Sequence, residues 1–503
     1  MLALFIGVVP WPLLDLIAPA RPPWSNWSAG RRIVSDEKPL ALLPEIFLIL
    51  GAVLTLLAGS FLPRHRQWIA RLVAVAALLG AGIAAAAALG DPIQSVYGTT
   101  FIIDTGTVFL RLVVVAATLL VIGLGVDELA GTRRESETYA LLLLSALGAV
   151  VMGSTTDLLV LVASFLLGSI PLYGLIGMLR SPGAAEAAMK TYLLGALFGI
   201  VLMLGVSVLY GVGGATAYPE LALGLARAPA AAVAFGLLAV LGGLMFKAGG
   251  VPGHFWVPDA AQAAGTPAAA FLTTIPKLGA LLAAYRLMTV MPDSVDWPLL
   301  VAVLAAVTMT VGNLAALAQT DVRRLLGWST VSQVGYLLLP VAVVGGTAAA
   351  LPALLVYLGG YAVTNLTAFA VIAAAPGRRT VEDYTGLATT HPWLGSALVV
   401  SLLSLVGTPP TAVFLSKLGV FTVAWDGGFA WLVVIAAVNT VASLFYYLRW
   451  LGPAFRRDDS MEPAAGLAPF ATAAAVAGGV GVLVLGVIVV SLAPVVETSL
   501  GAR

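Results

Sequence analysis

The chain contains no cysteine and only three histidines, His65, His254 and His391. Without cysteine it can form neither disulfides nor cysteine-ligated iron–sulfur clusters, and it lacks the ligands of a Cys-rich zinc site. Three widely spaced histidines are also a poor basis for a haem with two histidine ligands. We therefore expect no cofactor and no metal in this chain, so any linked electron transfer would take place in other proteins.

Charged side chains are scarce as well, at 10% of the residues, whereas soluble globular chains carry about 25%. The 25 Lys+Arg and 24 Asp+Glu give a net charge of +1, so we expect no basic face for nucleic acid. Hydrophobic residues make up 60% of the chain, and the mean hydropathy is +1.03. These values indicate that the chain lies in a lipid bilayer.

Apolar windows of about 20 residues, long enough to cross a bilayer, occupy most of the 503 residues. They show none of the ten-residue alternation of a membrane β-barrel. The sequence therefore predicts an all-α polytopic membrane protein with about 14 transmembrane helices. The windows are 42–62, 68–90, 105–126, 137–153, 157–179, 190–212, 229–250, 267–291, 297–318, 324–345, 351–375, 393–424, 428–454 and 467–493.

The distribution of arginine predicts how these helices are oriented. Arginines lie mainly in the connections after odd-numbered helices, and acidic residues in those after even-numbered helices. Because short Lys/Arg-rich loops stay in the cytoplasm, both ends of the fourteen-helix core should lie outside it. Residues 1–39 combine an apolar, proline-containing stretch with cations, and we interpret them as a non-spanning extension. A signal-like segment, an interfacial anchor or a misassigned start are the alternatives.

Three lysines lie inside predicted spans, Lys247, Lys277 and Lys417. On insertion scales each costs about 2.5–3.5 kcal/mol at the middle of a membrane, so an intramembrane lysine indicates function unless it reaches an interface or is paired structurally. A buried ammonium loses hydration, which favours its neutral form and allows proton exchange near neutral pH. The three lysines are therefore candidate proton-relay groups.

Two of these lysines lie beside predicted breaks in their helices. Lys247 precedes two glycines and Pro252, and Lys417 follows a glycine, Pro409 and Pro410. Broken membrane helices leave backbone groups unpaired and are tolerated where protein or a water-filled cavity receives them. Each break falls in the fourth helix of a set of five, and because five is odd the two sets should be inverted repeats.

This interpretation divides the chain into five parts. They are an N-terminal extension over 1–39, three helices over 40–136, a first five-helix repeat over 137–291, a second over 292–454, and a C-terminal helix with its tail over 455–503.

His254 follows the first break and is a further candidate for the relay. Imidazole titrates near neutral pH, and water could connect His254 with Lys247 and Asp259. The alternative is an ordinary hydrogen-bonding histidine. His65 and His391 lie in polar loops and are interpreted as surface residues.

Several stretches resemble the antiporter-like membrane subunits of bacterial NADH–quinone oxidoreductase, respiratory complex I, over residues 40–455. Within that family, the length of the chain and Lys417 favour the subunit N group. The most specific stretches are L-L-P-E-I-F-L-I-L-G (42–51), M-F-K-A-G-G-V-P-G-H-F-W-V-P-D (245–259), G-T-P-A-A-A-F-L-T-T-I-P-K (265–277) and S-L-V-G-T-P-P-T-A-V-F-L-S-K (404–417).

The resemblance implies a proton-pumping module in the membrane arm of complex I, in the bacterial cell (inner) membrane. Lys247, Lys277 and Lys417 would be its half-channel and connecting residues, and His254 matches a histidine of the family motif. The partners would be other membrane-arm subunits in a hetero-oligomer. Flavin, iron–sulfur clusters and quinone would belong to partner subunits, so this chain would be a non-redox part of a translocase.

The chain departs from the family pattern at two positions. Leu166 stands where the family usually carries a buried glutamate that pairs with the lysine matching Lys247, so Lys247 should be more often neutral or find another partner. Gln333 stands where histidine is usual, and glutamine cannot carry the charge. Both changes leave open a structural paralogue with a degraded proton path. A subunit of a related cation/proton antiporter or membrane hydrogenase complex is the other alternative.

Overall fold

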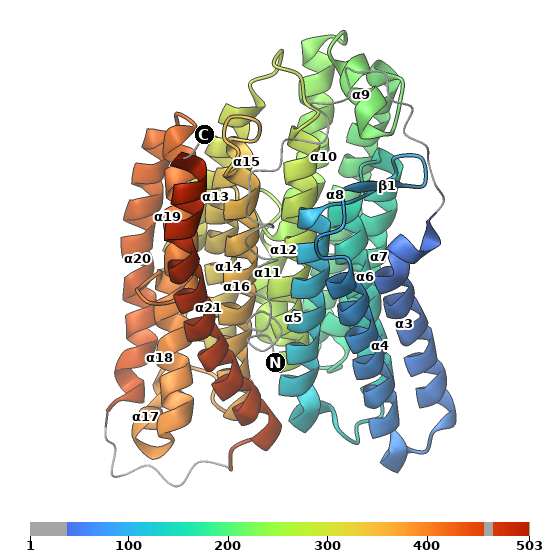
Figure 1. Cartoon of the computed structure of the whole chain (residues 1–503). Coiled ribbons are helices and arrows are strands. Elements are labelled where there is room, and N and C mark those ends of the chain that lie inside the picture. Colours follow the sequence, from blue (N-terminus) through green and yellow to red (C-terminus); the bar gives the residue numbers. More distant parts are fainter. Residues whose placement is uncertain (1–37, 457–465, 502–503) are drawn as a thin grey trace.

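The structure, a computed structural model, describes residues 38–456 and 466–501, so most of the predicted extension over 1–39 lies outside the described residues. Long helices run side by side through the molecule, and a short hairpin and several small helices join their ends (Figure 1). The helices are η2 (Pro39–Leu42), α3 (Leu43–Phe61), η3 (Arg64–Arg66), α4 (Trp68–Ala87), α5 (Thr105–Leu129), α6 (Glu135–Ser154), α7 (Leu158–Gly177), α8 (Pro182–Gly213), α9 (Tyr218–Leu225), α10 (Ala230–Ala248), α11 (Trp256–Ala263), α12 (Thr266–Met288), α13 (Trp297–Leu317), α14 (Val322–Leu337), α15 (Leu339–Ala342), α16 (Ala350–Ala374), η4 (Glu382–Tyr384), α17 (Leu387–Thr390), α18 (Pro392–Val406), α19 (Ala412–Asp426), α20 (Ala430–Ala454) and α21 (Pro469–Gly501); the strands are β1 (Gln94–Val96) and β2 (Phe101–Ile103).

The predicted number of spans agrees with the structure. Among the described residues, thirteen helical segments are long and apolar enough to cross a membrane. The fourteenth predicted span, 393–424, corresponds to α18 and α19, which have 15 residues each and are separated by a break. Neither half reaches the roughly 20 residues that a bilayer requires, so the two together form the span.

Two sets of five spans repeat the same packing. In the first, α6 packs against α7 and α12, and α8 packs against α10; in the second, α13 packs against α14 and α20, and α16 packs against α18. The second helix of each set begins at an N-cap aspartate, Asp157 or Asp321, whose carboxylate accepts hydrogen bonds from the first turn. Each aspartate also forms a β-bridge with the loop after the third helix, at Ala217 or Thr380.

The two sets are inverted relative to each other. Asp157 lies at the end of the molecule that carries β1 and α9, whereas Thr380 precedes α17 at the opposite end (Figure 1). The fold is therefore a polytopic helical bundle with two inverted five-helix repeats, each with a broken helix. The limits 40–136, 137–291, 292–454 and 455–503 remain our proposed division of the chain.

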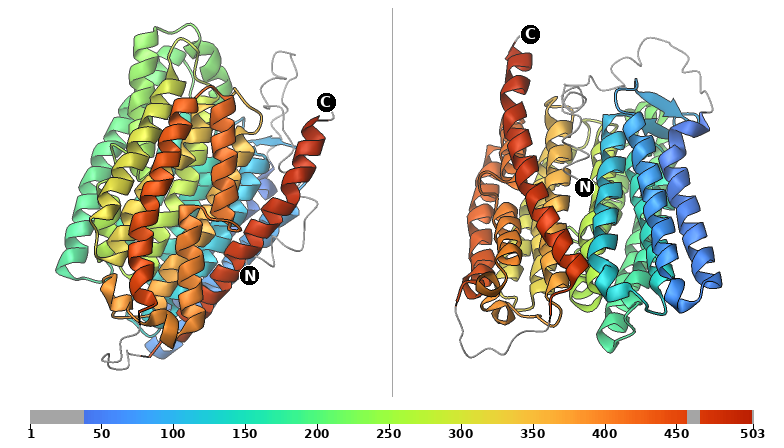
Figure 2. Two further views of the ribbon diagram at one scale, coloured as in Figure 1. Left: turned by 90° about the vertical axis from the view of Figure 1, so that its left-hand side faces the viewer. Right: turned by 60° about the horizontal axis from the view of Figure 1, so that its bottom comes forward.

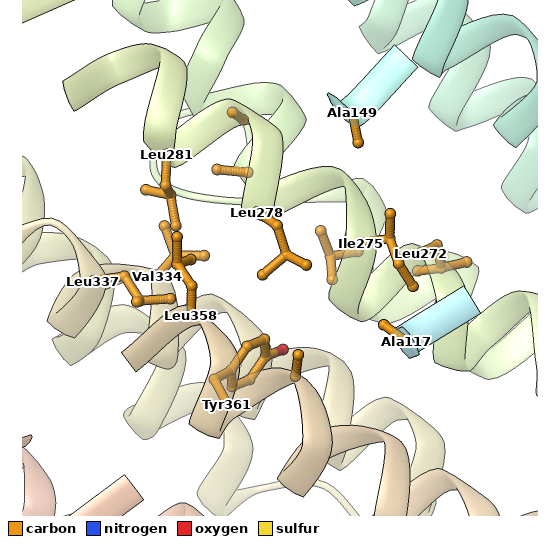
Figure 3. Packing of buried hydrophobic residues seen from close by; sticks show 14 of the residues in the cluster. Ala117, Ala149, Leu272, Ile275, Leu278, Leu281, Val334, Leu337, Leu358 and Tyr361 are labelled. Carbon is orange, nitrogen blue, oxygen red and sulfur yellow. The ribbon is translucent and has the colours of Figure 1, made fainter. Parts of the chain in front are cut away.

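Helix α12, the last helix of the first repeat, lies between the other helices of that repeat and the second repeat, and it is buried along nearly its whole length. Its apolar side chains contact α5 and α6 on one side and α14 and α16 on the other. Figure 3 shows this packing, with Leu272, Ile275, Leu278 and Leu281 of α12, Ala117 and Ala149 on one side, and Val334, Leu337, Leu358 and Tyr361 on the other. A lysine on this helix therefore lies deep inside the protein.

Helix α21 runs obliquely across the bundle, from α5 to α19 (Figure 2). Its first turn is held by α5, because the Asp127 carboxylate accepts a hydrogen bond from the Ala471 backbone N–H at 2.9 Å. Further along, Gly486 lies directly against the Pro410 carbonyl, where a Cβ atom could not be accommodated. The last helix thus ties the first part of the chain to the second break.

Two buried arginines are paired with carboxylates. Arg286 of α12 binds Asp104, the N-cap residue of α5, through two N–H groups at 2.7 and 3.0 Å. Burial alone would raise the pKa of Asp104, but the neighbouring guanidinium outweighs it and holds this pKa below its usual value. Arg111 binds Glu45 in the same bidentate way, through two N–H groups at 2.9 Å each. These pairs fix α5 against α12 and α3.

Candidate functional site

Lys247 lies in the last turn of α10, directly before the first break, and is 2% exposed. Its Nζ donates a hydrogen bond to the Ser169 hydroxyl of α7 at 3.0 Å and lies 5.8 Å from the ring centroid of Phe165. Gly168 leaves space for it, because a Cβ there would lie 3.0 Å from Nζ. The sequence-predicted lysine is thus inside the protein, with a neutral hydroxyl as its partner.

Position 166 does not face Lys247. The Leu166 side chain is 37% exposed, on the outer side of α7, whereas Phe165, Gly168 and Ser169 form the inner side that contacts the lysine. The expectation that residue 166 would lie opposite Lys247 is corrected accordingly. The structure places Ser169 there, three residues further along the helix.

The first break ends α10 in a left-handed turn. Gly249 has a φ of +82°, and the backbone N–H groups of Gly249 and Gly250 both donate to the Met245 carbonyl. The following Val251 N–H donates to the Thr308 hydroxyl of α13 at 3.2 Å, and Pro252 supplies no donor. The broken helix therefore rests on the second repeat, as its unpaired backbone requires.

His254 is buried just after this break and lies beside two aromatic rings, 4.1 Å from Phe255 and 5.6 Å from Trp328 between ring centroids. Its Nδ1 has no hydrogen-bond partner among the described residues. Asp259 binds elsewhere, since its carboxylate accepts hydrogen bonds from Arg324 and, at 3.3 Å, from Lys190. The water-mediated connection of Lys247, His254 and Asp259 therefore stays a prediction.

Lys277 lies in the middle of α12, one residue after Pro276, and is 1% exposed. Its Nζ donates to the Thr273 carbonyl of its own helix at 2.6 Å. The same carbonyl accepts a hydrogen bond from the Tyr361 hydroxyl of α16 at 2.7 Å, and that hydroxyl contacts Thr330 of α14 at 3.0 Å. A hydroxyl chain therefore leads from Lys277 into the second repeat.

Lys417 lies on α19, just beyond the second break, and is 3% exposed. Its Nζ donates to the carbonyl oxygens of Val406 at 2.8 Å and Leu405 at 3.3 Å, both at the C-terminal end of α18. It also lies 4.3 Å from the ring centroid of Tyr336. A helix C-terminus and an aromatic face both favour a cation, so this pocket accommodates an ammonium group.

The second break resembles the first in its geometry. Gly407 has a φ of +93°, and the backbone N–H groups of Gly407 and Thr408 both donate to the Leu403 carbonyl. Pro409 and Pro410 follow and supply no donors. A Cβ at Gly407 would lie 3.0 Å from Cδ of the lysine on α19, so glycine provides both the turn and the space for that side chain.

Gln333, which departs from the family pattern, joins the Lys417 pocket. Its amide nitrogen donates to the Leu405 carbonyl at 3.0 Å, the same carbonyl that accepts from the lysine. Its amide oxygen accepts from the Tyr357 hydroxyl of α16 at 2.7 Å. Glutamine thus makes two hydrogen bonds in this pocket, although it cannot be charged.

These contacts connect the lysine-bearing helices. Helix α10 packs against α12, α12 packs against α14 and α16, and α16 packs against α19. The links to Lys277 and Lys417 come from one face of α16, four residues apart, through Tyr361 and Tyr357. The sequence reasoning missed these tyrosines and Ser169; hydroxyl groups repeated at helical spacing inside an apolar span were the available signal.

Buried lysines beside two broken helices in inverted repeats define an antiporter-like membrane protein. Residues 155–443 match the family described as NADH:quinone oxidoreductase/Mrp antiporter, TM. The chain is 58% identical over 421 residues to NADH-quinone oxidoreductase subunit N of Mycobacterium sp. (strain JLS), covering 84% of this chain and 90% of the relative. It is 53% identical to subunit N 1 of Streptomyces griseus, with 86% and 92% covered.

A solved structure gives the same result. A chain of respiratory complex I from Thermus thermophilus superposes with a TM-score of 0.78 at 32% identity, with 90% of this chain and 98% of that chain covered. The chain belongs to the NADH:quinone oxidoreductase/Mrp antiporter family and, within it, to the subunit N group of NADH-quinone oxidoreductase.

Proposed function

We propose that the chain is a proton-translocating, non-redox subunit of an NADH–quinone oxidoreductase, with Lys247, Lys277, Lys417 and His254 as its relay residues. The observation that carries this proposal is that all three buried lysines donate only to neutral oxygens, and that Lys247 and Lys417 lie next to the two helix breaks. An ammonium held by neutral groups can release a proton without separating an ion pair. Such a line of groups suits proton transfer through the membrane.

The partners follow from the same proposal. Other membrane-arm subunits of complex I would form the hetero-oligomer, in the bacterial cell (inner) membrane. Flavin, iron–sulfur clusters and quinone would be held by those partners, because this chain has no cysteine for cluster ligation. The contribution of this chain is then to bind, hold and pass protons while quinone reduction occurs elsewhere.

The deciding variant is Lys247→Ala in the assembled complex, reconstituted in vesicles. We expect acidification and coupled quinone reduction to fall while a native gel shows normal assembly, because the change removes a relay group and also relieves the cost of inserting a charge. Lys190→Ala is the matched control, since Lys190 is half-exposed and pairs with Glu186 and Asp259. Unchanged pumping in normally assembled Lys247→Ala complex would favour a structural subunit with a degraded path.

A further inference from the structure

The hydroxyl that holds Lys247 is itself locked in orientation. Ser169 is 1% exposed and donates its own proton to the Phe165 carbonyl, one turn earlier on α7, at 2.6 Å. Its oxygen lone pairs are therefore left to accept from the lysine, at 3.0 Å. A hydroxyl whose proton is already donated to a carbonyl can only accept a further hydrogen bond.

We propose that Ser169 is the positioning residue for Lys247. This inference rests on the proposed relay role of Lys247. An oriented hydroxyl accepts a hydrogen bond from either an ammonium or a neutral amine, whereas a carboxylate strongly prefers the ammonium. Ser169 therefore keeps Lys247 in one place through both protonation states and does not hold its proton.

The test compares two variants in the assembled complex, with the initial rate of vesicle acidification as the readout. Ser169→Ala removes the acceptor, and we expect a fall of about tenfold, the effect of one hydrogen bond to a charged group. Ser169→Thr keeps the hydroxyl and should restore pumping to near the original level.

Ser164→Ala is the matched control on the same helix. Ser164 is equally buried and also donates to a carbonyl of its own helix, that of Leu161 at 2.8 Å, so its loss should leave pumping unchanged. If Ser169→Ala fails to assemble, Ser169→Cys, which has a similar size but a weak acceptor, replaces it and should show the same fall.

Two outcomes would overturn the proposal: normal pumping in assembled Ser169→Ala or Ser169→Cys complex, or a fall in Ser169→Thr as large as in Ser169→Ala. If Lys247→Ala abolishes pumping while Ser169→Ala does not, only the positioning role fails. If Lys247→Ala leaves pumping unchanged, both proposals fail.

Discussion

Replacing Lys417 by methionine tests the second break with the least disturbance, because methionine has a similar length and no charge. The structure limits the cost. Of the two carbonyls that accept from the lysine, Leu405 keeps the amide of Gln333 at 3.0 Å, so only the Val406 carbonyl loses its donor. One buried unpaired acceptor costs about 1–3 kcal/mol, and the lost contact with Tyr336 adds about 0.5–2 kcal/mol.

This cost is matched by a gain of similar size, because a lysine inside the membrane costs about 2.5–3.5 kcal/mol on insertion scales. We therefore expect the Lys417→Met complex to assemble normally. A positioned proton-transfer group contributes about 10²–10⁴-fold to a rate, so pumping should fall on the order of a hundredfold or more, at least as far as in Lys247→Ala. Lys417→Arg should not restore pumping, since arginine keeps its proton at any physiological pH.

The assay is acidification of reconstituted vesicles driven by NADH and quinone, with assembly followed on native gels. A Lys417→Arg complex that pumps normally would refute proton release at this position and would favour a fixed structural cation. Normal pumping with Lys417→Met would refute any role of the charge.

Two further predictions concern the glycine of the second break and the buried ion pair of α12, each with a control variant. Gly407→Ala and Gly428→Ala should both lower the free energy of unfolding by about 1–2 kcal/mol, because both glycines have positive φ. Only Gly407→Ala should also lower pumping, because a Cβ at Gly407 would press on the side chain of Lys417, whereas nothing lies within 4 Å of a Cβ at Gly428. Equal pumping in the two variants would contradict the contact with the lysine on α19. Asp104→Asn leaves the charge of the Arg286 guanidinium uncompensated and should lower the free energy of unfolding by about 3–5 kcal/mol. The control Asp91→Asn lies in an exposed loop and should change it by less than about 0.5 kcal/mol. Thermal unfolding in detergent measures both.

Composition predicts the spans of this protein well, because a bilayer permits only helices that are apolar over their whole length. The breaks were visible for an equally direct reason: Gly249 and Gly407 adopt positive φ, and the prolines after them cannot continue a helix. Lys247, Lys277 and Lys417 stood out because charge inside a span is costly. All three lie in the interior, where the sequence placed them.

The partners of the lysines could not be predicted in the same way. Whether residue 166 or residue 169 faces Lys247 depends on how α7 is rotated about its axis, and an almost uniformly apolar helix carries no pattern that specifies that rotation. Buried hydroxyl groups are similarly ambiguous, because serine and threonine can satisfy themselves on their own helix, as Thr364 does on the Gly360 carbonyl. Only the packing of α7, α14 and α16 shows which of them reach a lysine.

The buried cations of the described chain fall into two groups that separate structure from transport. The two buried arginines, Arg111 and Arg286, each bind a carboxylate through two N–H groups, and arginine stays charged at any physiological pH. The three buried lysines all donate to hydroxyl or carbonyl oxygens, which can accept from a charged or a neutral amine. Fixed charge is thus placed where helices must be held together, and charge that can change is placed where we propose that protons pass.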